Sequence, residues 1–418
     1  MLLEFTVGNY LSFKDKKTLS LEASSIKEFP ENVFQAGKYN LLRSAVIYGA
    51  NSSGKSNLIK AMQKMSEIIL NSSKQSSTDK IDVIPFLLNI ETENAPSYFE
   101  ILFLIDDVRY RYGFEVDKDI VHSEWLFACT GTKEQMLFIR EKDEIEISND
   151  FVEGKGLEER VRDNGLFLSV VDQFNGRISK KILTYMNLKL QFISGISHNA
   201  GATIYFLSNK TYDAQIRQFL RLFNLGFDEF EVNEKIIEGL NDGTWLRYLN
   251  EKIRTIHYKY NDQGVRIGTQ PFSLENQESS GTNKLFDLIG SIISSLIYGN
   301  TFFVDELDAK LHPLLTLQIV KLFHSPETNP KNAQLIFATH DTNLLDYGQF
   351  RRDQIYFTEK DRMEATDLYS LVEFKDADGV KVRNDRKFEK DYIAGRYGAI
   401  PFIGDISNIM KDGTDSEN

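Results

Sequence analysis

A glycine-bounded loop between a short apolar strand and a helix carries the clearest chemistry in the chain. It fits the pattern G-x-x-x-x-G-K-[ST] at every fixed position. The glycines let successive backbone N–H groups face a polyphosphate, and the helix that begins near Lys55 adds the positive end of its dipole. Lys55 is expected to reach the β- and γ-phosphates, and the hydroxyl of Ser56 is expected to bind Mg²⁺. The residues predicted to bind the nucleotide are Gly49, Ala50, Asn51, Ser52, Ser53, Gly54, Lys55, Ser56 and Asn57.

The alternative for this loop is an ordinary strand–turn–helix connection that contains two glycines. The sequence before the loop is an apolar strand at 44–48. The sequence after it is an amphipathic helix that is expected to run from Lys55 to about Asn71. Because the motif requires both flanking elements, the phosphate-binding loop is the better interpretation.

A second apolar strand, at 301–304, is followed by two acids, Asp305 and Glu306. Beside a phosphate-binding loop, Asp305 would hold Mg²⁺ directly or through water, and Glu306 would polarise the attacking water. An apolar run followed by two acids is common, and taken alone it indicates a solvated strand end. Its pairing with the loop makes Glu306 and Lys55 catalytic candidates, and makes Asp305 and Ser56 the candidate metal ligands.

A third apolar strand, at 334–338, is followed by Thr339 and His340. The His340 side chain is predicted to donate a hydrogen bond to the γ-phosphate and to sense its loss, which makes it the third catalytic candidate. An ordinary histidine at a strand end is the alternative. His312 is expected only to cap or pack near the helix that begins after Pro313.

Ser279, Ser280 and Gly281 precede another helix and form a second candidate anion-binding loop. One polyphosphate needs only one such loop. These residues are therefore expected to contact a nucleotide that is bound elsewhere, on another subunit. An ordinary helix N-cap is the alternative.

The spacing of apolar residues predicts the elements that position these motifs. An alternating pattern predicts an N-terminal hairpin over 1–22 and an antiparallel meander over 98–148, and residues 157–255 have a helical pattern. Farther on, helices alternate with strands, which is typical of a largely parallel sheet in an α/β fold. This part is predicted to contain a helix at 283–298, a strand at 301–304, a helix at 314–323, a strand at 334–338, a helix at 342–350 and strands within 354–374.

Composition limits the class of protein. The 418 residues are enough for a large body with insertions, and the single cysteine, Cys129, rules out an internal disulfide framework and a cysteine-based zinc site. The net charge of −12 does not favour non-specific binding to nucleic acid or membranes. The N-terminus lacks the pattern of a signal peptide, and the longest apolar run is too short to span a bilayer. We therefore expect a soluble cytoplasmic protein.

The ordered set of motifs resembles the ABC-type ATPase head of the SMC, Rad50, RecF and OLD proteins. More closely, the chain resembles the stand-alone AAA15/AAA21 ATPases of bacterial defence loci, the RloA-like group, with which it also shares the run at 388–401. The resemblance implies a P-loop NTPase of the α/β class. Its expected parts are an N-terminal half of the head with an antiparallel β region at 1–156, an inserted helical lobe at 157–255, a C-terminal half of the head at 256–350 and a small C-terminal module at 351–418.

In such heads, two subunits enclose two ATP molecules and Mg²⁺. By this resemblance, Ser279 and Gly281 contact the γ-phosphate of the partner's nucleotide, and Asp308 couples the two sites. The chain departs from the family pattern because it reads Ser-Ser-Gly-Thr where Ser-Gly-Gly-Gln is usual. The glutamine of the Q-loop is not assigned, although Gln173 and Gln191 are candidates.

The resemblance implies an Mg²⁺-dependent ATPase that works as a homodimer or larger homo-oligomer. Its expected role is a nucleotide-controlled switch in antiphage, abortive-infection defence, with a separate effector that is a nuclease of the RloB-like or Toprim-containing kind. The alternative is a repair ATPase of the RecF or Rad50 kind that binds DNA directly. The acidic composition and the lack of a coiled-coil arm argue against it.

Three other features of the sequence bear on alternative functions. Asp376–Gly379 could belong to a nuclease domain, but a hairpin turn is the better interpretation, since only about 40 residues follow. Basic clusters at 177–181 and 351–352 could contact phosphates, but clusters of this size usually form solvated faces. A metabolic kinase is disfavoured, because it needs no second phosphate loop.

Overall fold

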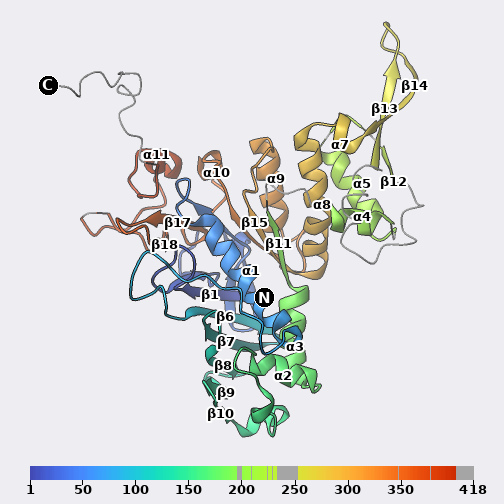
Figure 1. The fold of residues 1–418 in the computed structure, drawn as a ribbon. Coiled ribbons are helices and arrows are strands. Elements are labelled where there is room, and N and C mark those ends of the chain that lie inside the picture. The colour runs from blue at the N-terminus through green and yellow to red at the C-terminus, as the bar shows by residue number, and fades with distance from the viewer. Residues whose placement is uncertain are drawn as a thin grey trace, which may run out of the picture.

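The computed structural model of this chain (Figure 1) describes residues 1–194, 200–208, 210–223, 225–227, 229–232, 253–346, 348–376 and 378–401. A six-stranded sheet, called the main sheet below, lies at its centre. All neighbouring strands of this sheet are parallel except the last pair. Its order is β11 (Leu190–Ser194), β15 (Thr301–Asp305), β16 (Gln334–Ala338), β5 (Ser44–Tyr48), β17 (Ile355–Lys360) and β18 (Thr366–Ser370).

The two faces of the main sheet are covered by different layers, because alternate residues of a strand point to opposite faces. On β5, Ala45 and Ile47 belong to one hydrophobic core, and Val46 and Tyr48 belong to the other. All five residues of β5 are buried. This explains why β5 is an uninterrupted apolar run with no alternation.

The first core lies between the main sheet and a seven-stranded antiparallel sheet, with α1, α2 and α3 packed into it. The meander expected over 98–148 forms five consecutive strands of this second sheet, and the predicted N-terminal hairpin adds the other two. The strands are β10 (Glu144–Ile147), β9 (Gln135–Glu141), β8 (Val121–Cys129), β7 (Val108–Val116), β6 (Ser97–Ile105), β1 (Leu2–Gly8) and β2 (Lys17–Ser20). The helices are α1 (Lys55–Asn71), α2 (Phe167–Gln173) and α3 (Arg177–Leu188).

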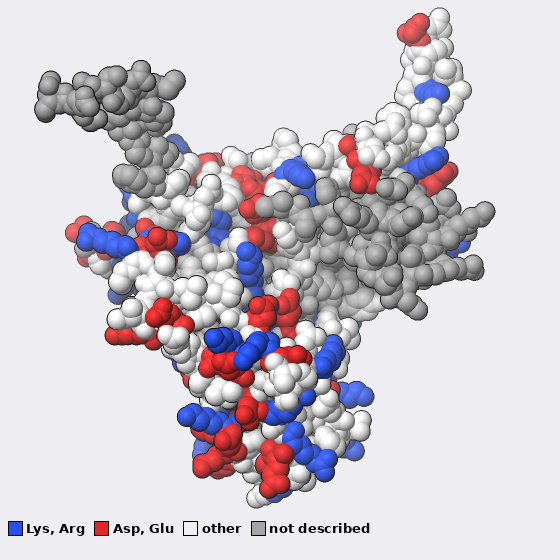
Figure 2. Space-filling model, viewed as in Figure 1, with Lys and Arg blue, Asp and Glu red and all other residues white. Residues whose placement is uncertain are grey.

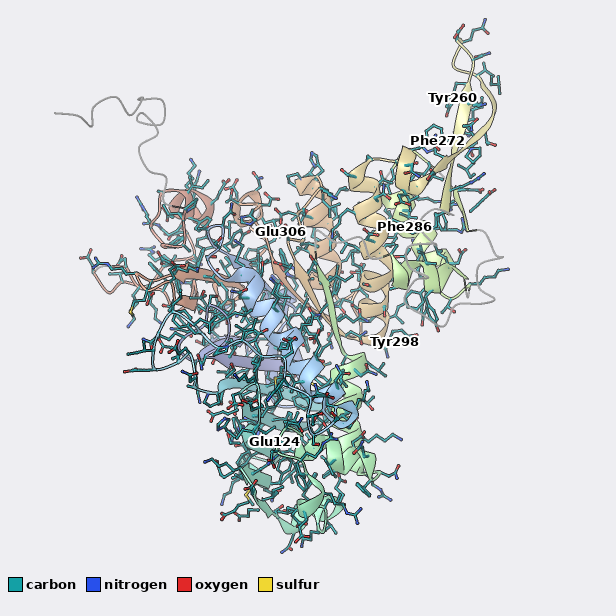
Figure 3. All side chains as sticks on the ribbon, in the orientation of Figure 1. Glu124, Tyr260, Phe272, Phe286, Tyr298 and Glu306 are labelled. Carbon is teal, nitrogen blue, oxygen red and sulfur yellow. The ribbon has the colours of Figure 1, made fainter. Side chains whose placement is uncertain are left out.

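Glu124 of β8 joins the antiparallel sheet to α2 (Figure 3). Its carboxylate is fully buried and accepts hydrogen bonds from the Tyr112 hydroxyl at 2.8 Å and from the backbone N–H groups of Phe167 and Leu168 at 2.6 and 3.0 Å. Burial raises the pKa of this carboxyl above its ordinary value. The buried carboxylate therefore satisfies the first N–H groups of α2, whose cap residue makes no side-chain hydrogen bond.

The second core lies on the other face of the main sheet and contains helices from the later part of the chain. They are α4 (Gly201–Ser208), α5 (Asp213–Leu222), α8 (Ser280–Tyr298), α9 (Pro313–His324), α10 (Asn343–Asp346) and α11 (Phe388–Ile393). The short helix α7 (Leu274–Gln277) precedes α8. Two smaller sheets complete the fold: β3 (Val33–Ala36) with β4 (Tyr39–Leu42), and β12 (Glu229–Val232) with β13 (Ile253–Tyr260) and β14 (Arg266–Ser273), whose last two strands project as a ribbon (Figure 1).

The structure differs from two expectations. The segment 157–255, expected to be helical, also contains the strands β11 and β12 and the start of β13. Of these, β11 pairs with β15 and so belongs to the main sheet. The prediction of a helix over 342–350 was wrong in extent, since α10 ends at Asp346. Gly348 follows with φ of 59°, a left-handed conformation that stops a helix. The four-part division of the chain stays a prediction.

The hairpin turn expected at Asp376–Gly379 is confirmed at its described positions. Lys375 and Lys381 form an antiparallel bridge, and the N–H of Gly379 donates to the Asp376 carbonyl at 2.9 Å. A helix long and apolar enough to cross a bilayer is absent from the described part of the chain.

His324, the last residue of α9, is expected to make the stability of the fold depend on pH. It is buried, its Nε2 lies 2.7 Å from the Ser44 hydroxyl, and burial, assisted by the charge of Arg43, lowers its pKa to about 3. The His324 imidazole therefore binds a proton less readily in the folded state than in the unfolded state, where the pKa of a histidine is about 6.5. The contribution of His324 to the free energy of unfolding is fully present above about pH 6.5. It is lost, at up to about 1.4 kcal/mol per pH unit, as the pH falls towards 3.

Urea denaturation at about pH 7.5 and about pH 5.5 tests this prediction through the difference between variants. The buried N-terminal amine, whose pKa is lowered to about 5, also titrates in this interval and contributes equally to each of them. The wild-type chain should lose about 1 kcal/mol or more, and His324→Gln should lose clearly less. Gln318→Ala, at an exposed position of the same helix, serves as the control and should keep the wild-type slope, since it removes no titratable group. Equal slopes in the wild type and His324→Gln would contradict the assignment.

Candidate functional site

The predicted phosphate-binding loop lines a cavity at the carboxyl edge of the main sheet. The cavity, called the P-loop pocket below, has a volume of about 470 Å³. Residues 51–57 line it together with Glu306, His340 and Lys360. These residues lie together because the parallel strands β5, β15 and β16 all end at the same edge of the main sheet.

The two glycines of the loop are required by close approaches. A Cβ atom on Gly49 would lie 2.4 Å from Ser53 Oγ and 2.5 Å from the Thr358 carbonyl oxygen. Gly54 has a φ of 114°, and a Cβ atom there would lie 2.3 Å from Thr366 Oγ1. Any larger residue at either position would displace the loop from its neighbours.

The hairpin of β17 and β18 holds the loop in place, a feature that the sequence analysis missed. The hydroxyls of Ser53 and Thr358 lie 2.6 Å apart, and Thr366 Oγ1 lies 2.9 Å from the Ser53 carbonyl oxygen. Ser12, in the turn between β1 and β2, accepts a hydrogen bond from the Asn57 amide at 2.8 Å. Strand patterns over 354–374 and 1–22 were visible in the sequence, but no local signal indicates that these strands contact the P-loop.

Lys55 at the start of α1 is buried, with 5% of its surface exposed. Its ammonium group donates hydrogen bonds to the carbonyl oxygens of Gly49 at 2.8 Å and Ala50 at 3.0 Å. Burial lowers its pKa, and the nearby carboxylates of Asp305 and Glu306 act in the opposite direction. The cation is therefore held inside the loop, where a polyphosphate would replace the carbonyl oxygens as its partner.

Asp305 is the last residue of β15, and its surroundings fit a metal ion. The Oδ1 atom is buried and has no hydrogen-bond partner among the described residues. A buried carboxylate oxygen without a partner is costly, so a cation is the expected partner. Described residues contain no cluster of three or more His, Cys, Asp or Glu side chains that could hold a metal. Ser56 and Asp305 stay the predicted Mg²⁺ ligands, and phosphate and water oxygens would complete the coordination, as is usual for this ion in proteins.

Glu306 lies in the P-loop pocket where β15 ends (Figure 3). Its φ of 55° is left-handed, which is uncommon for a residue with a side chain. The turn that follows maintains this conformation, because the N–H of Ala309 donates to the Glu306 carbonyl and the N–H of Leu307 donates to Ala338, both at 3.1 Å. Backbone strain of this kind is common at residues that perform chemistry.

His340 lies in the same pocket, after the end of β16. Its backbone N–H donates to both carboxylate oxygens of Asp308, at 3.3 and 3.4 Å. Asp308 therefore joins the loops after β15 and β16 within one chain. Its predicted role in coupling two subunits stays a prediction.

Ser279, Ser280 and Gly281 do not line the P-loop pocket of their own chain. Ser279 is the N-cap of α8, and its hydroxyl accepts a hydrogen bond from the N–H of Thr282 at 3.0 Å. Both serines are exposed, and a Cβ atom on Gly281 would lie 2.8 Å from the Lys310 carbonyl oxygen. The structure thus has the cap that the alternative interpretation described, and it leaves the loop accessible to another molecule.

The other residues considered in the sequence lie outside the P-loop pocket. Gln191 bonds to the hydroxyls of Ser294 and Ser295, and Gln173 donates to the Ser73 carbonyl. His312 caps α9, as expected, because its Nδ1 accepts from the N–H of Leu314 at 3.2 Å.

Lys360 is a pocket residue that the sequence analysis did not single out. It is the last residue of β17, and its ammonium group pairs with Glu364 at 3.2 Å. Lys360 thus adds a second cation to the lining of the pocket, and Glu364 offsets part of its charge. Motif spacing could not have found it, because it is about 300 positions from the P-loop in the sequence.

Comparisons with known proteins identify a family for this chain. A search of curated proteins found no significant match. Among solved structures, the chain is similar to the SMC head domain from Thermotoga maritima, with 12% identity, a TM-score of 0.38, and coverage of 88% of this chain and 98% of that one. The family model described as "AAA domain, putative AbiEii toxin, Type IV TA system" matches residues 44–346, which include the P-loop, Glu306 and His340. Because this match spans more than half of the chain, the chain belongs to this family of P-loop ATPases.

Proposed function

We propose that this chain is an Mg²⁺-dependent ATPase that hydrolyses ATP when two copies pair, and that the ATP-bound pair controls a separate effector in bacterial antiphage defence. The effector is a nuclease encoded apart from this chain. The protein acts in the cytoplasm, where ATP and phage nucleic acid are available. Each copy supplies one P-loop pocket and one Ser279–Gly281 loop.

The observation that carries this proposal is the division of the phosphate-binding groups into two places. The P-loop, Glu306 and His340 line one pocket, whereas Ser279 and Ser280 are exposed outside it. A hydroxyl-rich helix N-terminus that cannot serve its own nucleotide is suited to a nucleotide on another copy. Closed pairing with two-fold symmetry would fill both pockets equally.

The residues of the pocket fit in-line transfer of the γ-phosphoryl group to water. Lys55 and the backbone N–H groups of the loop would hold the β- and γ-phosphates, and Mg²⁺ would neutralise charge on the same oxygens. Glu306 would accept a hydrogen bond from the attacking water and so orient it. His340 would contact the γ-phosphate, and its link to Asp308 would transmit the presence of that group to the loop after β15.

The family description supports the biological part of the proposal, since it names a toxin and a type IV toxin–antitoxin system. The net charge of the chain argues against direct binding of duplex DNA, and so it supports a separate effector. The chain has a net charge of −12, and acidic and basic side chains are mixed over the described surface seen in Figure 2. A protein that holds duplex DNA by itself would be expected to present a continuous basic surface.

A mixing experiment tests whether two copies share a site. Ser280→Arg blocks the exposed loop, and Lys55→Ala disables the P-loop, so each variant alone should lose ATPase activity. A one-to-one mixture should recover about a quarter of the wild-type rate, because half of the random pairs contain one complete site of two. Phosphate release measures the rate.

Ser77→Arg, an exposed change in the loop after α1, is the matched control and should keep full activity alone. A mixture that stays inactive, or a Ser280→Arg variant with the wild-type rate, would refute the shared site. Tight binding of duplex DNA by the purified chain at physiological salt would favour a repair ATPase over the defence switch.

A further inference from the structure

A second cavity lies at the opposite edge of the main sheet from the P-loop pocket. Its volume is about 880 Å³, and we call it the basic cavity. Lys189 precedes β11, Tyr298 and Gly299 precede β15, and Lys331 precedes β16, so the cavity borders the amino ends of three strands. Helix α3 and the turn between β6 and β7 form the remaining walls. Figure 3 shows Tyr298 and Glu306 on either side of β15, which connects the two regions.

The charged groups of this cavity are mostly cations. Five basic side chains and two carboxylates line it, and five minus two leaves a net charge of +3, against −12 for the whole chain. The cations are Arg177, Lys180, Lys181, Lys189 and Lys331, and the carboxylates are Asp106 and Asp107. The basic cluster at 177–181, noted in the sequence, thus forms part of the wall of an open cavity.

Most of these cations lack an acidic partner. Lys181 pairs with Asp106 at 2.8 Å, but within the described residues Arg177, Lys180, Lys189 and Lys331 form no ion pair. Lys189 is partly buried and donates to the Tyr298 carbonyl oxygen, and burial lowers its pKa. Several unpaired cations around one cavity favour an anion, because the anion would reduce their mutual repulsion.

Part of the remaining wall is apolar. Leu104, Ala36 and the ring of Tyr185 line it. The Tyr185 ring is stacked on Phe103 with centroids 4.6 Å apart, which fixes its orientation. A volume in the range of small-molecule sites, with apolar walls and a few convergent charges, is suited to a ligand with an apolar body and an anionic group.

We infer that the basic cavity binds a small phosphorylated molecule with an aromatic body, of about the size of a nucleotide. The site is separate from the P-loop pocket and does not depend on ATP hydrolysis. Arg177, Lys180 and Lys331 hold the phosphate, and the walls formed by Leu104 and Tyr185 hold the aromatic body.

Isothermal titration with 1-naphthyl phosphate tests this inference on the full chain. The probe has the predicted chemistry and no triphosphate for the P-loop. It should bind the wild type, and its affinity should fall at least about tenfold in the double variant Lys180→Glu/Lys331→Glu, since both cations are lost. Neutral 1-naphthol should bind much more weakly. Lys55→Ala should bind the probe as the wild type does, so failure of the ATPase proposal would leave this result unchanged.

The double variant Lys74→Glu/Lys155→Glu is the control, because it makes the same charge change at two exposed lysines outside the cavity. It should keep the wild-type affinity, and thermal melting should show that both double variants are folded. Equal affinity in the wild type and Lys180→Glu/Lys331→Glu would overturn the inference. Tighter binding of an oligothymidine than of the probe, lost in the same variant, would overturn it in favour of a nucleic-acid surface.

Discussion

Replacing Glu306 with glutamine is expected to lower the rate of ATP hydrolysis by a factor of about 100 or more, while ATP still binds. The Glu306 carboxylate lies in the P-loop pocket but is not part of the loop that holds the phosphates. Glutamine keeps the size of the side chain and removes the charge that would polarise the attacking water. The change should therefore affect the chemical step and leave the ground-state contacts in place.

This variant should also stabilise the paired state. If ATP holds two copies together and its hydrolysis separates them, Glu306→Gln with ATP and Mg²⁺ should elute as a dimer or larger species in size-exclusion chromatography with light scattering. Glu327→Gln, at an exposed position after α9, is the matched control and should behave as the wild type. An ATP-loaded Glu306→Gln chain that stays monomeric, or one that hydrolyses ATP at the wild-type rate, would contradict the proposed mechanism.

Replacing Lys55 with alanine is expected to weaken nucleotide binding by a factor of about 100 or more, because the pocket loses its buried cation. Lys55 is enclosed by the loop, and among the described residues its ammonium group has the carbonyl oxygens of Gly49 and Ala50 as its hydrogen-bond partners. A phosphate placed there would exchange these neutral partners for a charged one. Isothermal titration with ATP and Mg²⁺ measures the loss of affinity.

Lys60→Ala provides the comparison for Lys55→Ala, since Lys60 is an exposed lysine on the same helix. It should bind ATP as the wild type does. Thermal melting should show that both variants are folded, which separates a binding defect from a folding defect. Wild-type affinity in folded Lys55→Ala would exclude the P-loop as the nucleotide site.

The local elements of the site could be predicted from residue types and spacing. The P-loop could be recognised because its function requires fixed residue types within eight consecutive positions. The strands β5, β15 and β16 could be recognised because strands buried on both faces are short, continuous apolar runs. Their parallel order also placed Glu306 and His340 beside the loop, since parallel strands end at one edge.

The distant residues that complete the site could not be predicted from local patterns. The contacts of Thr358 and Thr366 with the P-loop, the entry of Lys360 into the pocket and the place of β11 in the main sheet depend on pairings between segments that are far apart in the sequence. The grouping of unpaired cations around the basic cavity likewise depends on bringing α3 next to the loop that holds Lys331. Local patterns report which face of an element is buried, whereas the partner that buries it is set by the packing of the whole chain.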